Sequence, residues 1–234
     1  DTDRMIGAFN QQFPEHIPLL SLQNGVTNLE RIIQVRGAAQ ALAGSVTFGA
    51  KITAPGGVQV AVHAGDVKIG GIDTAIDYGF VKGIAEMFSA AGIKTDPTRE
   101  IYKFLWGKML YNCSLNGLAA ILDVRYGELL EHESSRALIA DIVGEIFLVL
   151  EREGRVVSWP SAQAYCEDLF ERLLPLTANH IPSMLQDLQA GKRTEIDALN
   201  GTIVDLAEKH GLDVPVNWLI TRLMKVKEKT AGEL

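Results

Sequence analysis

Cysteine is scarce in this sequence, and positive charge is not in excess. Each of these shortages excludes some classes of function. Only two of the 234 residues are cysteines, Cys113 and Cys166, so the sequence has no disulfide framework and no metal-ligand spacing of thiols. We therefore expect a reducing compartment. The formal net charge of −7 argues against sequence-independent binding of nucleic acids, which depends on a basic surface that neutralises phosphates. An anionic ligand must instead be held by local groups.

The sequence also lacks the signatures of a membrane protein, a metalloenzyme or a hydrolase. Its longest apolar run, LIADIVGEIFLVL at residues 138–150, is interrupted by Asp141 and Glu145, and no charged leader with an apolar core opens the chain. The five histidines form no H-x-x-H or H-E-x-x-H pattern, and no serine lies in a G-x-S-x-G motif. We expect a cytoplasmic protein without a metal site and without membrane or nucleic-acid partners.

Hydrophobic periodicity divides the chain near residue 97. Before this point short helical patterns alternate with β-branched runs, which predict the strands HIPLLSL, SVTFGA, VQVAVHA, DVKIG and IKT and the helices LERIIQV and YGFVKGIAEMFSAAG. After it the patterns are helical alone, near residues 98–121, 126–153, 161–174, 183–190, 194–210 and 216–229. Asp96 and Pro97 are suited to the cap and first turn of the first of these helices. We predict a parallel or mixed sheet with helical cover, followed by an all-α domain.

Three polar residues recur every fourth position in the apolar stretch KFLWGKMLYNCSLNG, at Lys108, Asn112 and Asn116. At about 100° per residue, Lys108 falls in the middle of the apolar stripe of this helix. One interpretation is a lysine that extends to solvent from the helix edge, with asparagines that cap nearby backbone. Buried polar groups without partners each cost about 1–3 kcal/mol, so three on one line favour a polar pocket that binds a ligand.

A possible partner for the lysine lies on a second predicted helix, residues 194–210. The same helical geometry puts Glu195 at the border of the buried face. A glutamate in a first turn is also favoured by the helix dipole alone, which is the simpler explanation. A buried carboxylate is what a buried ammonium needs, and we hypothesise that Lys108 pairs with Glu195.

Two further segments are candidates for ligand contacts. Ser183 is placed to open the helix at 183–190 as its N-cap, where a hydroxyl and backbone donors can also hold a carboxylate. Asn24 and Gly25 follow the predicted strand HIPLLSL, and ligands of open α/β sheets lie beyond the carboxyl ends of strands. An ordinary Asn-Gly turn is the alternative.

Four motifs, in this order over nearly the whole chain, resemble the ketopantoate reductase family: LLSLQNGVTN, KMLYNCSLNGLAAIL, SMLQDLQAGKRTEIDALNG and HGLDVPVN. The resemblance implies NADPH-dependent reduction of 2-dehydropantoate (ketopantoate) to pantoate in pantothenate biosynthesis. It implies that residues 1–97 are the C-terminal half of a Rossmann-type dinucleotide-binding domain. Residues 98–234 would form a helical domain similar to that of 6-phosphogluconate dehydrogenase, with the active site in the cleft between the two domains.

The resemblance also assigns roles to the candidate residues. By it, Lys108 is the general acid that protonates the ketone oxygen, and Glu195 orients the lysine and contacts the substrate. By the same resemblance, the substrate is bound by Asn112, Asn116 and Ser183. The cofactor NADP(H) is bound by Asn24 and Gly25.

The sequence departs from the family pattern in one respect, since it contains no G-x-G-x-x-G motif for the pyrophosphate. We therefore expect that the chain starts about halfway through the dinucleotide domain and does not turn over by itself. A reductase of another 2-keto acid and a non-catalytic helical binding or assembly module remain as alternatives. Long apolar helices at 136–150 and 216–226 could supply the surface of a homodimer.

Overall fold

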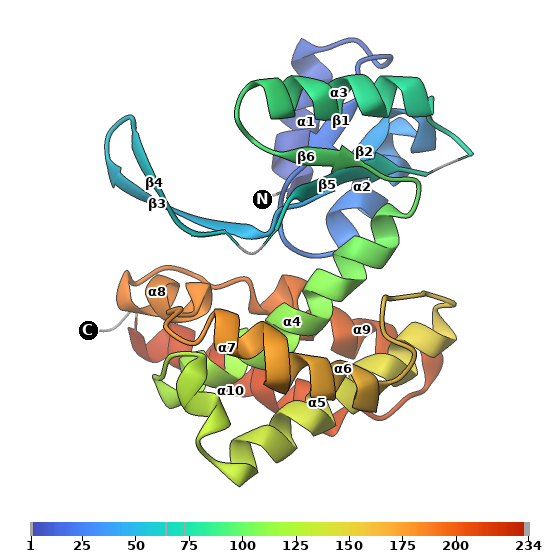
Figure 1. The fold of residues 1–234 in the computed structure, drawn as a ribbon. Coiled ribbons are helices and arrows are strands. Elements are labelled where there is room, and N and C mark those ends of the chain that lie inside the picture. Colours follow the sequence, from blue (N-terminus) through green and yellow to red (C-terminus); the bar gives the residue numbers. More distant parts are fainter. Residues whose placement is uncertain (1, 64, 73, 232–234) are drawn as a thin grey trace. The chain divides into compact units, whose positions relative to one another are not determined.

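The computed structural model describes residues 2–63, 65–72 and 74–231 and divides the chain into two units, Asp1–Leu105 and Trp106–Leu234 (Figure 1). The division falls inside helix α4 (Ile101–Leu122), so this helix belongs to both units. The domain boundary near residue 97 stays a prediction. Among the described residues, no helix combines the length and the apolar character needed to cross a bilayer.

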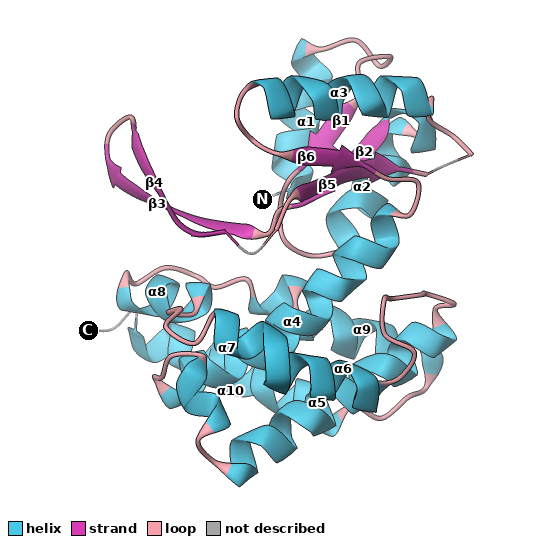
Figure 2. Ribbon diagram, viewed as in Figure 1, coloured by secondary structure: helices cyan, strands magenta, loops and turns pink. Residues whose placement is uncertain are grey.

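The first unit contains a mixed four-stranded sheet with helices, as predicted (Figure 2). The strands lie in the order β1-β2-β5-β6, and the pairs β1–β2 and β5–β6 are parallel whereas β2–β5 is antiparallel. The strands are β1 (Leu19–Ser21), β2 (Ala41–Ser45), β5 (Val67–Gly71) and β6 (Thr95–Pro97). The helices are α1 (Thr2–Gln12), α2 (Thr27–Arg36) and α3 (Tyr78–Ala90), with a short 3-10 helix at Ala38–Gln40.

A two-stranded hairpin projects from this sheet (Figure 2). Its strands are β3 (Phe48–Ala54) and β4 (Gly57–His63), which pair antiparallel. The run SVTFGA, predicted as one strand, is divided between two: β2 ends at Ser45 and β3 begins at Phe48. The start of β2, at Ala41–Gly44, was missed because three of its four residues, Ala41, Ala43 and Gly44, are small and carry little β propensity of their own.

One cluster of core residues in the first unit lies between the sheet and helix α3. Leu42, Val67 and Ile69 of the sheet are buried with Val81 of α3, which alternation along the strands and the helical period bring to one side. The carboxylate of Asp77 caps α3, because it accepts hydrogen bonds from the first free backbone N–H groups of that helix.

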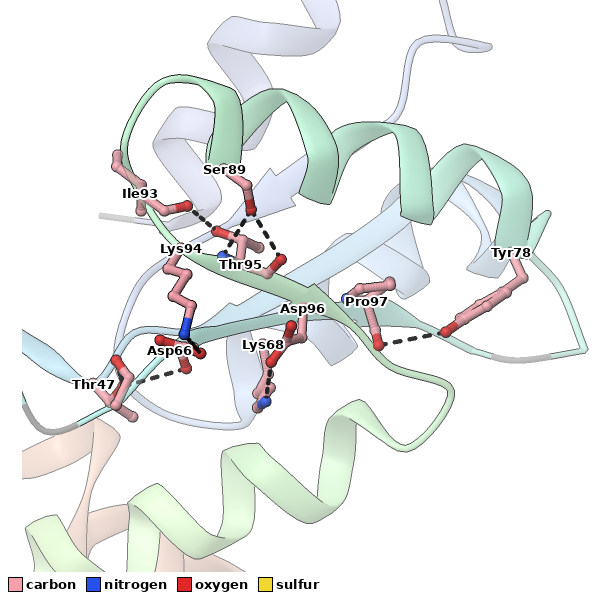
Figure 3. Close-up of polar contacts among 11 residues, drawn as sticks. Thr47, Asp66, Lys68, Tyr78, Ser89, Ile93, Lys94, Thr95, Asp96 and Pro97 are labelled. Carbon is pink, nitrogen blue, oxygen red and sulfur yellow. Dashed lines mark hydrogen bonds and ion pairs between the residues drawn. The ribbon is translucent and has the colours of Figure 1, made fainter.

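Strand β6 corrects one prediction about the helix that follows. Asp96 and Pro97 do not open α4; they pair in parallel with Lys68 and Ile69 of β5. Figure 3 shows how side chains hold this strand: Ser89 Oγ donates to the carbonyl of Thr95 at 3.2 Å, and Lys68 forms an ion pair with Asp96. A proline at a sheet edge needs no backbone donor, so the residue type alone did not distinguish strand from helix start.

The second unit consists of helices joined by loops, with no strand among its described residues, as predicted. Besides α4, its longer helices are α5 (Glu133–Arg152), α9 (Asn200–His210) and α10 (Pro215–Ala231). The shorter helical segments are Gly127–Leu130 (3-10), α6 (Ala162–Asp168), Leu169–Leu173 (π), α7 (Leu174–Leu176), α8 (Ser183–Gln189) and Ile196–Ala198 (3-10).

Helix α4 is surrounded by the other helices of the second unit. All eight residues from 113 to 120 are buried, so the helix has no single apolar stripe. Its approach to α10 is close: a Cβ added at Gly117 would lie 2.8 Å from the side chain of Ile220. At its C-terminal end Lys227 Nζ donates to the carbonyls of Ala120 and Ile121, at 3.0 and 2.8 Å, which satisfies acceptors that the helix leaves open. The helix that carries the polar line is therefore fixed on several sides.

Candidate active site

Lys108 lies in the middle of α4 with its side chain half-buried. Burial lowers the pKa of its ammonium group, and the carboxylate of Glu195 acts in the opposite direction. Desolvation is the larger of the two causes, so the lysine holds its proton less tightly than a lysine in water. A group of this kind can both stabilise a developing negative charge and donate a proton to it.

Glu195 does not lie on α9, which corrects the helical geometry used to place it. The helix begins at Asn200, and Glu195 immediately precedes the 3-10 segment Ile196–Ala198. Its carbonyl accepts hydrogen bonds from the backbone N–H groups of Ala198 and Leu199, at 2.9 and 3.1 Å, so the chain turns tightly after it. This turn nevertheless brings the carboxylate close enough to raise the pKa of Lys108.

Asn112 follows Lys108 by one helical turn and is also half-buried. Within residues 2–63, 65–72 and 74–231, its carboxamide makes no hydrogen bond to the protein. An asparagine side chain carries two donors and an acceptor, which makes it a group that a polar ligand can use.

Asn116, one turn further, is 3% exposed and bonds to the start of α8 through both its oxygen and its nitrogen. Its Nδ2 donates to Ser183 Oγ at 2.8 Å, and its Oδ1 accepts from the backbone N–H of Met184 at 3.1 Å. The asparagine of α4 thus caps the start of another helix. One hydrogen of its amide remains for a further acceptor.

Ser183 is the first residue of α8 and not its N-cap, so that prediction is wrong by one position. The residue before it, Pro182, occupies the cap and makes no side-chain cap bond. Because Ser183 Oγ accepts from Asn116, its own hydroxyl hydrogen is left to donate. A half-buried hydroxyl donor at a helix start suits a carboxylate.

Asn24 and Gly25 lie in the first unit, in the loop between β1 and α2. The Asn24 carbonyl accepts from Asn28 Nδ2 at 2.7 Å, and Gly25 has a φ of 93°, a conformation that favours glycine. The loop is therefore an ordered turn at the carboxyl end of a parallel strand and at the start of a ten-residue helix. Backbone donors at such a position fit an anionic dinucleotide.

Three polar residues next to this site were not predicted from the sequence. Thr194 donates from both its backbone N–H and its Oγ to Oε1 of Glu228, at 2.7 and 2.6 Å. Asp187 of α8 is half-buried, and desolvation and then the charge of Glu195 raise its pKa. Glu228 lies in the charged pattern KVKEKT, which in sequence looks like a solvated helix face. Only its proximity to the Glu195 turn reveals it.

No group of three histidine, cysteine or carboxylate side chains that could hold a metal ion occurs in the part of the chain that the structure describes. Both cysteines are free, and Cys113 is buried in α4. The site therefore consists of an amine, carboxylates, amides and a hydroxyl.

Two family profiles match the chain. The profile described as "Ketopantoate reductase PanE/ApbA" matches residues 1–74, and "Ketopantoate reductase PanE/ApbA C terminal" matches residues 100–228. Among curated relatives, the 2-dehydropantoate 2-reductase of Aquifex aeolicus is 38% identical over 228 residues, which are 97% of this chain and 73% of that protein.

Solved structures of similar fold include members of the same family. A PanE/ApbA family ketopantoate reductase from Ralstonia eutropha JMP134 has a TM-score of 0.86 at 28% identity, covering 99% of this chain and 73% of that one. The ternary structure of D-mandelate dehydrogenase with NADH and anilino(oxo)acetate has a TM-score of 0.84 at 26% identity, covering 98% of this chain and 74% of that one.

Proposed function

Since the chain belongs to the ketopantoate reductase family, we propose that the protein reduces 2-dehydropantoate to pantoate with NADPH, a step of pantothenate biosynthesis. One observation carries the proposal beyond family membership. Lys108 is a half-buried amine whose pKa is lowered by desolvation and raised by the carboxylate of Glu195. Such an amine is suited to give up a proton when a neighbouring oxygen becomes negative.

The reaction adds a hydride to the carbonyl carbon of the keto acid and a proton to the carbonyl oxygen. A bound nicotinamide dinucleotide supplies the hydride. In the proposal, the Lys108 ammonium donates a hydrogen bond to the ketone oxygen, stabilises the charge that develops there and then transfers its proton, leaving a neutral amine. Glu195 orients the ammonium and contacts the substrate.

The remaining side chains of the second unit bind the substrate in this proposal. The carboxamide of Asn112 contacts substrate oxygens, and the Ser183 hydroxyl donates to the substrate carboxylate. Asn116 uses its remaining amide hydrogen and also holds Ser183 in place, a role that its two hydrogen bonds to α8 support. In this proposal these groups recognise the 2-keto acid unit of the substrate, and none of them contacts its distal end.

Asn24 and Gly25 are the proposed cofactor contacts of this chain. Their position at the start of α2 fits the phosphates of a dinucleotide. NADPH in preference to NADH is part of the proposal, and it is tested by comparing kcat/KM for the two cofactors in the full-length gene product. A higher value with NADH contradicts this part alone.

The central test is an assay of the full-length gene product for NADPH oxidation that depends on ketopantoate. We expect turnover with the unaltered protein and its near-complete loss in Lys108→Met, which removes the amine but keeps the length of the side chain. Absence of ketopantoate-dependent oxidation in the unaltered protein contradicts the proposed function.

A second candidate function is reduction of a different 2-keto acid. The similar fold of D-mandelate dehydrogenase, solved with anilino(oxo)acetate, favours keeping it. A panel of ketopantoate, 2-ketoisovalerate and phenylglyoxylate, compared by kcat/KM, separates the two. We expect ketopantoate to rank first, and a higher value for phenylglyoxylate would support the second candidate.

We also propose that the protein acts in the cytoplasm as a homodimer. A cytoplasmic location is consistent with two free thiols. Helix α10 exposes a run of large apolar side chains that suits a dimer surface, namely Trp218, Leu219, Leu223 and Val226. Leu219→Asp combined with Leu223→Asp should lower the molar mass measured by light scattering from dimer to monomer. Val156→Asp, at a side chain that is 72% exposed elsewhere, is the control that should leave the mass unchanged.

A further inference from the structure

The turn that presents Glu195 is held by a second glutamate, from α10. Oε1 of Glu228 accepts two hydrogen bonds from Thr194, one from the backbone N–H at 2.7 Å and one from Oγ at 2.6 Å. Thr194 Oγ in turn accepts from the backbone N–H of Ile196 at 3.3 Å. The residues on both sides of Glu195 are thus tied to one carboxylate.

Most of this arrangement is shielded from water, which strengthens its hydrogen bonds. Thr194 is 7% exposed, and the side chain of Glu228 is 12% exposed. Hydrogen bonds to a carboxylate are stronger than those between neutral groups, and more so away from water. The carbonyl of Glu195 is fixed as well, by the N–H groups of Ala198 and Leu199. The backbone of Glu195 therefore has little freedom while Glu228 is in place.

We propose that Glu228 is a positioning residue for the reaction: through Thr194 it fixes the turn that aims the carboxylate of Glu195 at Lys108. This inference rests on the proposed function, in which Lys108 is the proton donor. Glu228 itself touches neither substrate nor cofactor in this proposal. Its effect on catalysis passes through Glu195.

Other charged groups lie near Glu228 and near Glu195, the two ends of this series of contacts. At Glu228, Lys225 Nζ lies 3.6 Å from Oε2 and also pairs with Asp197, and Glu228 contributes to raising the pKa of Arg193. Lys225 thus contacts the oxygen of Glu228 that Thr194 does not use. Charge near Glu228 can be changed through Lys225 without touching the hydrogen bonds to Thr194.

At the other end, Asp187 and Lys192 share the surroundings of Glu195. Glu195 raises the pKa of Asp187, and Lys192 lowers it. Asp187 adds negative charge to that of Glu195. Neither residue hydrogen-bonds Thr194 or Glu228 within the described parts of the chain, so both remain in place in the variants below.

The direction of the expected effect follows from the two causes that act on Lys108. Glu195 raises the pKa of Lys108 and desolvation lowers it. If the turn loosens and the Glu195 carboxylate moves away, the raising cause weakens while desolvation stays. The pKa of Lys108 then falls further, and fewer molecules carry the proton at a given pH.

The test measures the pKa of Lys108 directly, by NMR titration of its Cε resonance, and kcat as a function of pH in the full-length gene product. In Glu228→Ala we expect the pKa to fall by roughly one unit, with the basic limb of the kcat profile at lower pH. We expect kcat to fall about ten- to a hundredfold through the misplaced carboxylate. Thr194→Val, which keeps the shape of the side chain, should give a smaller change in the same direction.

Conservative variants show whether Glu228 acts by positioning Glu195, by its charge or by stabilising the fold. Glu228→Gln keeps an acceptor for Thr194, and Thr194→Ser keeps the hydroxyl, so both should stay close to the unaltered pKa. Lys225→Met alters the charge at Glu228 and should also leave that pKa in place. Glu153→Gln is the stability control, because Glu153, at the end of α5, is also a partly buried carboxylate that bonds to a distant segment, but its partners are Lys209 and His210 of α9.

Two results overturn the inference: an unchanged Lys108 pKa in both Glu228→Ala and Thr194→Val, or the same pKa fall in Glu228→Gln as in Glu228→Ala. If Glu228→Ala does not fold, the comparison of Thr194→Val with Thr194→Ser tests the inference in its place. The NMR titration needs no substrate. A protein that shows the pKa shift but does not reduce ketopantoate therefore contradicts the proposed function and leaves the positioning role intact.

Discussion

The polar line of α4 changes its character between one turn and the next. At Lys108 and Asn112 the polar groups are half-buried, and the carboxamide of Asn112 makes no hydrogen bond within the described residues. At Asn116 the side chain is buried, and both its oxygen and its nitrogen bond to the start of α8. Two asparagines four residues apart in one helix thus serve different ends. The carboxamide of Asn112 is open to a ligand, whereas Asn116 uses both polar atoms of its amide to hold the start of α8.

This difference shows what a regular spacing can and cannot reveal. The interval of four residues correctly places polar groups along one line of a helix. It does not reveal which of them the protein uses for itself, because that depends on the helix that packs opposite. The variants below either break the distinction between the two turns or sharpen it.

The largest effect is expected at Lys108. Lys108→Met should lower kcat about a thousandfold, since general acid catalysis contributes roughly two to four orders of magnitude. The fold should persist, because a buried ammonium is replaced by an apolar side chain of similar length. Steady-state kinetics of the full-length gene product, with circular dichroism as the check on folding, measures both. A kcat within threefold of the unaltered protein would remove the acid role.

Asn116→Ala should mainly reduce stability. It leaves the N–H of Met184 without its acceptor and Ser183 without its donor, so we expect the free energy of unfolding to fall by about 2–3 kcal/mol. Urea denaturation measures the change. Asn112→Ala is the matched control and should stay within about 0.5 kcal/mol, since it removes no hydrogen bond to the described protein. Equal losses in the two variants would erase the distinction between the two turns.

Asn112→Ala should instead weaken substrate binding. Loss of one or two hydrogen bonds to the keto acid should raise KM for ketopantoate about ten- to thirtyfold. KM for NADPH is the internal control and should not change. An unaltered KM for ketopantoate would show that the open carboxamide of Asn112 faces something other than the substrate.

The smallest effect is a pH dependence of stability. The pKa of Lys108 is lower in the folded protein than its ordinary value of 10.5, so the unfolded chain binds more protons between the two values. Stability due to this group therefore rises with pH across that window, and below it the protonated lysine is unfavourable in the fold. Lys108→Met should have a higher Tm than the unaltered protein at neutral pH. That advantage should shrink as the pH approaches 10.5.

Much of the fold followed from periodicity, and the exceptions have local causes. The helical second unit, the mixed sheet and helix α3 were all predicted. The strand β6 was placed too early, and its residues Asp96 and Pro97 were assigned to a helix start. Asp-Pro suits both settings by local chemistry, and only pairing with β5 decides between them.

In the candidate site, too, local sequence did not reveal contacts with distant segments of the chain. Glu195 was placed on a continuous helix, whereas the chain makes a 3-10 turn before α9 begins. Its influence on Lys108 was still anticipated, because a buried amine needs a negative partner whatever the local backbone. Glu228 was not anticipated, since nothing in a charged helical pattern marks one glutamate as bonded to a distant turn.

The eight consecutive buried residues of α4 bear on how this region can change by mutation. An ordinary surface helix accepts substitutions on one side, so a saturation-mutagenesis profile along it rises and falls with each turn. Residues 113–120 have no outward side. We expect their profile to be uniformly intolerant, without helical periodicity, and sequence drift in this protein to be slowest there. An engineer who wants to alter the site should therefore work through the facing turns and leave this helix as it is.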